Sequence, residues 1–248
     1  MRVLLVRANR NDADAKALHA LRIETTIDPL IEVASTKNAE SIRRLKDALN
    51  QNVDRWLIAT SVNAIEFLKE AIGEEYLRKQ IEDAKNLRFA AVGDQTASAL
   101  RALGAEEVLT GEFADSKALA ESFQSIKPTS AIVPKGNLAS NFLENYLRDL
   151  GFVVTSETIY TTHPRAAETE TIDAINAGEI NLALLRSPSA AVSLASQINP
   201  AQLPVFTVGN STTLKASELG FTIAGSTRET SPEIVAAKIA ELQEGNTL

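Results

Sequence analysis

The chain of 248 residues contains no cysteine, which excludes disulfide bonds, thiolate metal sites and cysteine nucleophiles. It has only two histidines, and aromatic residues make up 5% of it. His19 and His163 stand far apart in the sequence, so a metal site built from clustered ligands is not expected. The lack of cysteine is compatible with a reducing compartment, and we expect a cytoplasmic protein.

Long apolar runs are also missing. The first run, Val3–Val6, is too short for a signal peptide, and nowhere do roughly 18 apolar residues follow one another. A net charge of −7 argues against broad binding of nucleic acid or anionic membranes, although a local basic cleft stays possible. There is no GxxxxGK[ST] loop, and neither Gly93-Asp94 nor Gly209-Asn210 has the spacing of a dinucleotide fingerprint, so no nucleotide is expected.

What the chain does have is an internal repeat. VGDQTASALRALG, residues 92–104, reappears without a gap as VGNSTTLKASELG, residues 208–220. Because shorter segments match in the same order, the chain reads as unit A, unit B, unit A and unit B, which indicates duplicated structural units. The shorter matches are residues 4–9 with 132–137 and residues 59–68 with 185–194.

Short apolar runs alternate with longer segments of helical period, which is typical of parallel α/β sheets. With 44% hydrophobic residues and a repeat, the chain is long enough for two domains. We therefore predict two similar α/β domains, each a parallel β-sheet flanked by helices. The expected strands are Val3–Val6, Trp56–Ala59, Phe89–Val92, Ala131–Val133, Val153–Thr155, Leu182–Leu185 and Val205–Val208.

The lengths of the junctions predict how the repeated units pair into domains. Only residues 125–130 separate the first B unit from the second A unit, which is too short to cross comfortably between domains. The other junctions are long, so the crossings are expected there. The prediction is a central domain inserted into a discontinuous outer one, with a two-stranded linker that permits hinge motion and a cleft between the domains. The outer domain is 1–33 with 167–248, the central domain is 39–160, and the linkers are 34–38 and 161–166.

Small polar and basic residues fill the turns that follow the strands. Ligands of open parallel sheets bind beyond the carboxyl ends of the strands. Helix N-termini there expose backbone N–H groups that donate hydrogen bonds to anions. The same residue types are ordinary helix N-caps, so capping is the alternative for each of them. The basic members could pair with carboxylates. The predicted substrate-binding residues are Arg7, Ser61, Asn63, Thr96, Lys135, Gly136, Arg186, Ser187, Ser189, Ser211 and Thr212.

A set of short motifs stands in a specific order along nearly the whole chain. They are Val6-Arg7, Pro29-Leu30-Ile31-Glu32, Thr60-Ser61-Val62-Asn63, the Ala91–Ala97 segment AVGDQTA, the Arg186–Ala190 segment RSPSA, the Val208–Thr212 segment VGNST and Ser231-Pro232-Glu233. In order and spacing this set resembles the uroporphyrinogen-III synthase family. The chain departs from that family at Ala8, Ala64 and Arg186-Ser187, where proline, glycine and Thr-Ser are usual.

The resemblance implies a cofactor-free hydro-lyase of tetrapyrrole biosynthesis, the route to haem and other porphyrin-related compounds. Its substrate would be hydroxymethylbilane, a linear tetrapyrrole that carries many carboxylates. The product would be uroporphyrinogen III, formed by ring closure with inversion of the terminal pyrrole and loss of water. We expect a monomer that binds this small molecule and neither nucleic acid nor membrane.

The resemblance also places the family's candidate acid at Tyr160. A phenol with a pKa near 10 is protonated at neutral pH and can donate a hydrogen bond to a departing hydroxyl. The alternative is a strand tyrosine that only packs its ring. Two other functions would also explain the architecture: a non-catalytic hinge-type binding protein for a small acidic ligand, and a regulatory module derived from the same fold.

Overall fold

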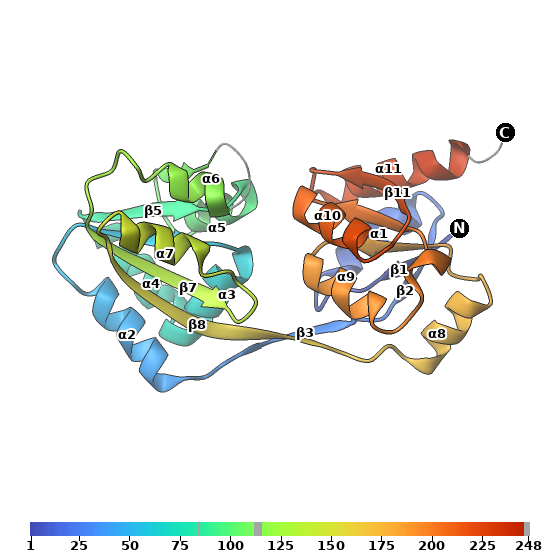
Figure 1. The fold of residues 1–248 in the computed structure, drawn as a ribbon, viewed down its shortest axis with the longest axis horizontal. Coiled ribbons are helices and arrows are strands. Elements are labelled where there is room, and N and C mark those ends of the chain that lie inside the picture. Colours follow the sequence, from blue (N-terminus) through green and yellow to red (C-terminus); the bar gives the residue numbers. More distant parts are fainter. Residues whose placement is uncertain (84, 112–115, 246–248) are drawn as a thin grey trace. The chain divides into compact units, whose positions relative to one another are not determined.

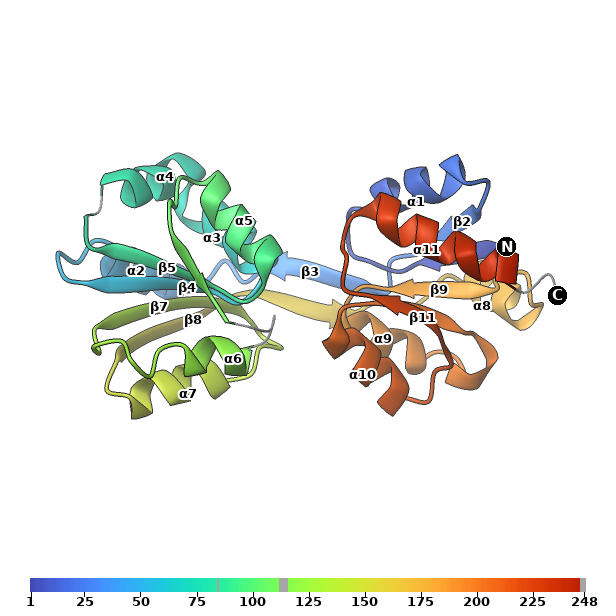
Figure 2. The ribbon, with the colours of Figure 1, turned by 90° about the horizontal axis from the view of Figure 1, so that it is seen from above.

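The computed structural model describes residues 1–83, 85–111 and 116–245. The chain divides into two compact units: unit 1 is Met1–Val33 with His163–Leu248, and unit 2 is Ala34–Thr162. The chain passes from one unit to the other within two strands, β3 (Ile31–Ser35) and β8 (Val153–Pro164), which are labelled in Figures 1 and 2. Each unit has its own sheet, and the predicted α/β class with parallel sheets flanked by helices is confirmed.

The sheet of unit 1 has the order β11-β10-β9-β1-β2, and its pairs are parallel. If these strands are numbered within the unit along the chain, their order is 2-1-3-4-5, which is the flavodoxin-like order. The strands are β1 (Arg2–Leu5), β2 (Glu24–Ile27), β9 (Leu182–Leu185), β10 (Val205–Val208) and β11 (Ile223–Thr227). The helices are α1 (Asn11–Ala20), α8 (Thr169–Asn176), α9 (Pro188–Ala195), α10 (Asn210–Glu218) and α11 (Pro232–Gly245), with a short 3-10 turn at Pro200–Gln202.

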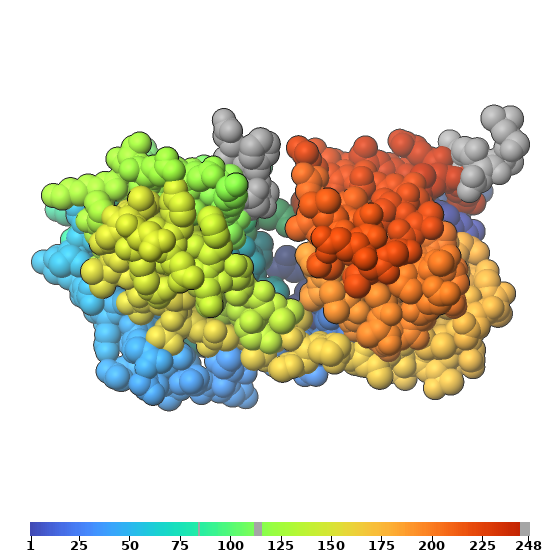
Figure 3. Space-filling model, viewed as in Figure 1, coloured from blue at the N-terminus to red at the C-terminus, as the bar shows by residue number. Residues whose placement is uncertain are grey.

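Both faces of this sheet are covered, and the alternation of side chains along a strand decides which core each residue joins. Val3 and Leu5 pack in the core beneath α1 and α11, whereas Leu4 and Val6 pack in the core beneath α9 and α10. Figure 2 shows these helix pairs on opposite sides of the sheet, and in Figure 3 the orange atoms of α9 and α10 cover it. Strands buried on both faces read as continuous apolar runs.

Unit 2 repeats this plan with the two halves in the other order along the chain. Its sheet has the order β3-β8-β7-β4-β5-β6. If β7 and β8 are taken as the first two strands and β4, β5 and β6 as the next three, the order is again 2-1-3-4-5, with β3 added beside β8. The further strands are β4 (Arg55–Ala59), β5 (Leu87–Ala91), β6 (Val108–Thr110) and β7 (Ser130–Gly136). The helices are α2 (Ala39–Leu49), α3 (Val62–Ile72), α4 (Glu74–Asp83), α5 (Asp94–Ala102), α6 (Ser116–Glu121) and α7 (Phe142–Asp149).

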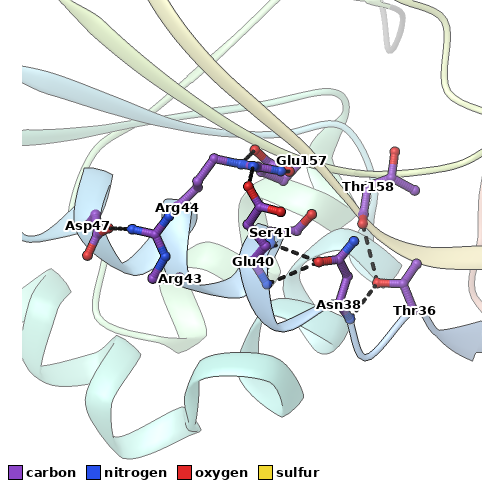
Figure 4. A network of polar contacts seen from close by, with 9 residues as sticks. All are labelled: Thr36, Asn38, Glu40, Ser41, Arg43, Arg44, Asp47, Glu157 and Thr158. Carbon is purple, nitrogen blue, oxygen red and sulfur yellow. Dashed lines mark hydrogen bonds and ion pairs between the residues drawn. The ribbon is translucent and has the colours of Figure 1, made fainter.

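Polar contacts fasten the start of α2 to β8 within unit 2 (Figure 4). The Asn38 side chain accepts hydrogen bonds from the backbone N–H groups of Glu40 and Ser41, at 3.0 and 3.1 Å, and so caps the helix. Arg44, one turn further along, makes ion pairs with Glu40 and with Glu157 of β8. The ion pair between Arg44 and Glu157 holds α2 against the strand that carries the predicted acid.

Four strands have no counterpart among the predicted ones: β2, β3, β6 and β11. Most residues in these strands are partly or fully exposed, so they lack the continuous apolar signal of a central strand. The strand expected at Val153–Thr155 is also much longer, because β8 continues through polar residues to Pro164.

Candidate functional site

In unit 2, Tyr160 occupies a largely buried position near the end of β8 and is only 8% exposed. Its ring stacks on Phe67 of α3, with centroids 5.1 Å apart and planes inclined by 16°. Its hydroxyl lies 3.0 Å from Ser61 Oγ. Ser61 Oγ already accepts a hydrogen bond from Ala64 N at 3.1 Å, so its own proton can be donated to Tyr160 Oη. That arrangement leaves the phenolic proton available for a ligand.

Gly136 at the end of β7 makes room for the Tyr160 ring. The two residues are partners in the sheet, next to an irregularity between Lys135 and Gly136. A Cβ atom on Gly136 would lie 2.5 Å from both Cε2 and Cζ of Tyr160 and 2.9 Å from its hydroxyl oxygen. Only glycine therefore allows this approach of strand and ring. Contact of Gly136 with substrate stays a prediction.

Asn137, which the sequence analysis did not select, fixes the backbone around Tyr160. Its N–H donates to Tyr160 O at 3.1 Å, and its Oδ1 accepts from Thr162 N at 2.8 Å. The side chain thereby takes the place of a strand partner beside the last part of β8. Its position in a polar turn, matched by Asn9 in the repeat, was the available sequence signal.

Burial raises the pKa of the Tyr160 phenol, and the hydrogen bond with Ser61 offsets only part of this effect. A phenol whose pKa is raised stays protonated throughout the neutral range, so Tyr160 is suited to donate a proton or hydrogen bond.

The raised pKa of Tyr160 also predicts a pH effect on stability. The folded protein favours the protonated phenol, so the corresponding stabilisation is complete below the unfolded pKa of about 10 and is lost as pH rises through the folded pKa. We expect the stability advantage of the wild type over Tyr160→Phe to shrink between neutral pH and about pH 11. Urea unfolding of both proteins at the two pH values measures this, and a constant difference would contradict it.

Lys135 lies in β7, one residue before Gly136, and is buried within unit 2. Its side chain is 11% exposed, and its ammonium donates to Asn141 Oδ1 and Glu144 Oε1. Glu144 is buried and also accepts a hydrogen bond from Ser156 Oγ at 2.9 Å. Because the Lys135–Glu144 pair is neutral as a whole, it adds little attraction for a substrate carboxylate.

In unit 1, Arg7 and Arg186 come together on one buried carboxylate, Asp14 of α1. Arg186 Nη2 donates to Asp14 Oδ1 at 2.5 Å, and its Nη1 donates to Thr230 O at 2.9 Å. Arg7 Nη1 lies 3.5 Å from Asp14 Oδ2. Burial and the charge of Arg186 lower the pKa of Arg7, and Asp14 opposes them. The repeat and the turn pattern indicated the two arginines, but not the carboxylate.

The remaining predicted residues lie at helix N-termini. Ser61 and Ser187 occupy matched positions with nearly the same backbone, φ −160° and −154°, and each caps its helix through the alanine three residues on. Capping is thus one role of both hydroxyls, and Ser187 Oγ also lies 3.1 Å from Ser189 Oγ. Asn63 and Ser211 are exposed, whereas Thr96 and Thr212 are buried, all four in first helical turns.

Glycines cap the two repeated helices α5 and α10. Gly93 and Gly209 have φ of 79° and 89°, a left-handed backbone that glycine adopts without strain. Neither supplies a side chain to the first-turn N–H groups, so these amides suit an anion.

Two hollows lie away from all these residues. One of about 460 Å³ is lined by Arg2, His19 and the start of β2, and one of about 320 Å³ surrounds Arg55 and Asn86. Neither contains a predicted site residue. No group of three or more His, Asp or Glu side chains suited to a metal occurs within residues 1–83, 85–111 and 116–245. In the same part of the chain, no helix is long and apolar enough to span a membrane.

Two units with the same flavodoxin-like strand order, each with polar residues gathered where its strands end, define a duplicated parallel α/β protein. The family model of uroporphyrinogen-III synthase HemD matches residues 12–236 of the chain. The chain therefore belongs to the uroporphyrinogen-III synthase family.

Solved structures share this fold at low sequence identity. A mutant uroporphyrinogen III synthase from the extremely thermophilic bacterium Thermus thermophilus matches with a TM-score of 0.74 and 18% identity over 99% of both chains. Uroporphyrinogen-III synthetase from Helicobacter pylori matches with a TM-score of 0.59 and 16% identity, over 97% of this chain and 99% of that one. A search among curated proteins found no match.

Proposed function

We propose that this protein is a uroporphyrinogen-III synthase, which converts hydroxymethylbilane to uroporphyrinogen III and water. Family membership supports the reaction type. The observation that carries the proposal for this chain is the environment of Tyr160, a protonated phenol that is positioned by Phe67 and Gly136 and can receive a hydrogen bond from Ser61.

In the proposed reaction, the carbon–oxygen bond of the terminal hydroxymethyl group breaks first. Tyr160 donates its proton to the departing oxygen, which leaves as water, and the N–H proton that the pyrrole ring bearing this group gives up restores the phenol. This leaves an azafulvene whose methylene carbon is electrophilic. The substituted α-carbon of the pyrrole ring at the other end of the tetrapyrrole attacks this methylene carbon and forms the carbon–carbon bond of a spiro intermediate. This intermediate rearranges to the inverted product. Because the substrate is itself reactive, the protein acts mainly by orientation, so that this attack is favoured over simple ring closure.

Substrate binding is assigned to the polar residues at the strand ends. Arg7 would attract a substrate carboxylate, and Arg186 would support Arg7 through Asp14. The first-turn N–H groups after Gly93 and Gly209 would donate hydrogen bonds to further carboxylates. Hydroxyl and amide side chains would add hydrogen bonds, namely those of Ser61, Asn63, Thr96, Ser187, Ser189, Ser211 and Thr212. Lys135 and Gly136 stay in the binding set as predicted, with Lys135 the weaker attraction because Glu144 balances its charge. A monomer, a cytoplasmic location and a cleft between the domains stay predictions.

The experiment that tests this proposal counts product molecules per protein molecule. Freshly prepared hydroxymethylbilane is supplied in large excess, the products are oxidised to porphyrins, and the type I and type III isomers are separated. A synthase forms many type III molecules per chain. A non-catalytic binding protein forms none beyond the heat-inactivated control, and that result would reject the proposal in favour of the binding function.

A further inference from the structure

In unit 1, the cluster of Arg7, Arg186 and Asp14 carries more positive than negative charge. Asp14 is 2% exposed and contacts two guanidinium groups, those of Arg186 and Arg7. Arg10 lies close enough for its charge to lower the pKa of Arg7 further. One carboxylate facing two guanidinium groups leaves a net positive charge.

The two arginines differ in how they hold Asp14. Arg186 is nearer, at 2.5 Å, and its side chain is 7% exposed. Arg7 is farther, at 3.5 Å, and 29% of its side chain is exposed. Asp14 Oδ2 and Arg186 Nε are buried without a hydrogen-bond partner, which indicates that the cluster is not saturated from within. Arg186 is therefore the nearer partner of Asp14, and Arg7 is the more exposed of the two arginines.

The matched position of unit 2 lacks this surplus. The repeat aligns Arg7 with Lys135, but Lys135 is 11% exposed and forms a one-to-one pair with Glu144. The difference arises from Arg186, which is the second cation in contact with Asp14. Within the described residues of these two clusters, only unit 1 keeps an unbalanced and partly exposed cation.

We propose that Arg7 binds one carboxylate group of an acidic ligand. Arg186 strengthens this binding indirectly, because it neutralises Asp14. Asp14 and Arg186 are positioning residues, because they set the charge and orientation of Arg7. A guanidinium presents parallel donors that match the two oxygens of a carboxylate. In its assignment to hydroxymethylbilane, this inference rests on the proposed function.

The proposal is tested with uroporphyrin I, a stable porphyrin polycarboxylate that needs no turnover. Its dissociation constant is measured by fluorescence titration for the wild type and for Arg7→Met, Arg186→Met and Asp14→Asn/Arg186→Met. Arg148→Met is the matched control, since Arg148 is an exposed arginine in the last turn of α7 that donates to Asn145. Thermal unfolding checks that each variant is folded.

We expect Arg7→Met and Arg186→Met each to raise the dissociation constant about tenfold, the size of one charge-assisted hydrogen bond. Arg186→Met should weaken binding of the probe even though Arg7 is still present, because Asp14 then pairs with Arg7. The double variant removes both members of the buried pair and leaves Arg7 unpaired, so binding should return to within about threefold of the wild type. Arg148→Met should leave the dissociation constant of the probe unchanged.

A double variant that binds as weakly as Arg186→Met would overturn the proposal, and so would a wild type that does not bind the probe. The KM for hydroxymethylbilane should follow the same order, with kcat little changed. If the wild type forms only type I isomer while the dissociation constants follow the expected order, the proposed function is wrong and the proposed role of Arg7 in carboxylate binding is supported. If type III isomer forms but the arginine variants keep the wild-type KM and dissociation constant, only the proposed role of Arg7 in carboxylate binding is wrong.

Discussion

Replacing Tyr160 with phenylalanine is expected to lower turnover of hydroxymethylbilane by about a hundredfold, the low end of what a general acid contributes. The change removes only the hydroxyl oxygen, so the stack on Phe67 at 5.1 Å is kept. Loss of the hydrogen bond with Ser61 should cost about 1 kcal/mol of unfolding free energy. Single-turnover kinetics and urea unfolding measure the two effects.

Tyr146→Phe is the matched control. Tyr146 lies on α7 and its hydroxyl accepts a hydrogen bond from Gln124 Nε2, so the same atom is removed where no catalytic role is proposed. Turnover of this variant should equal that of the wild type. If Tyr160→Phe were as active as Tyr146→Phe, Tyr160 would have no part in the chemistry and would serve only to pack its ring.

Gly136→Ala is expected to reduce turnover by a similar factor, although it removes no functional group. The new Cβ would lie 2.5 Å from two ring carbons of Tyr160, so the ring and its hydroxyl must shift. A misplacement of about 1 Å can cost roughly a hundredfold in rate. Overpacking of this kind typically costs about 1–3 kcal/mol of stability. The measurement is kcat, together with the unfolding free energy.

The control for Gly136→Ala is the double variant Gly136→Ala/Tyr160→Phe, compared with Tyr160→Phe alone. If the alanine acts by displacing the hydroxyl, it should reduce activity little further once that hydroxyl is gone, because the two residues act as a unit. If the double variant instead loses turnover by the product of the two single-variant factors, Gly136 acts through something other than Tyr160.

The fold was predictable wherever strands are buried on both faces. Leu182–Leu185 is a continuous apolar run, and Val205–Val208 is apolar except for Thr207, because helices cover both sides of their sheet. The observed bounds of both strands are those predicted. Strands such as β2, with the sequence ETTI, expose most of their residues and carry no such signal. The repeat made up for part of this loss, since it indicated a duplicated plan independent of any single strand.

The candidate site was less predictable because its supporting residues look like ordinary surface or core in the sequence. Asp14 and Glu144 lie on amphipathic helices, where a carboxylate is most often solvated, yet both are buried against cations. Phe67 reads as a core residue of α3, and only the fold brings it onto Tyr160. Local pattern selects the residue types, whereas these pairings depend on tertiary contacts between distant segments.

The isomer composition of the porphyrin made from hydroxymethylbilane tests the central claim most directly. The wild-type chain, at an amount far below that of the substrate, should give type III isomer as the main product, because the terminal ring is inverted before closure. A product that contains only the type I isomer, at the rate of the protein-free reaction, would contradict the account.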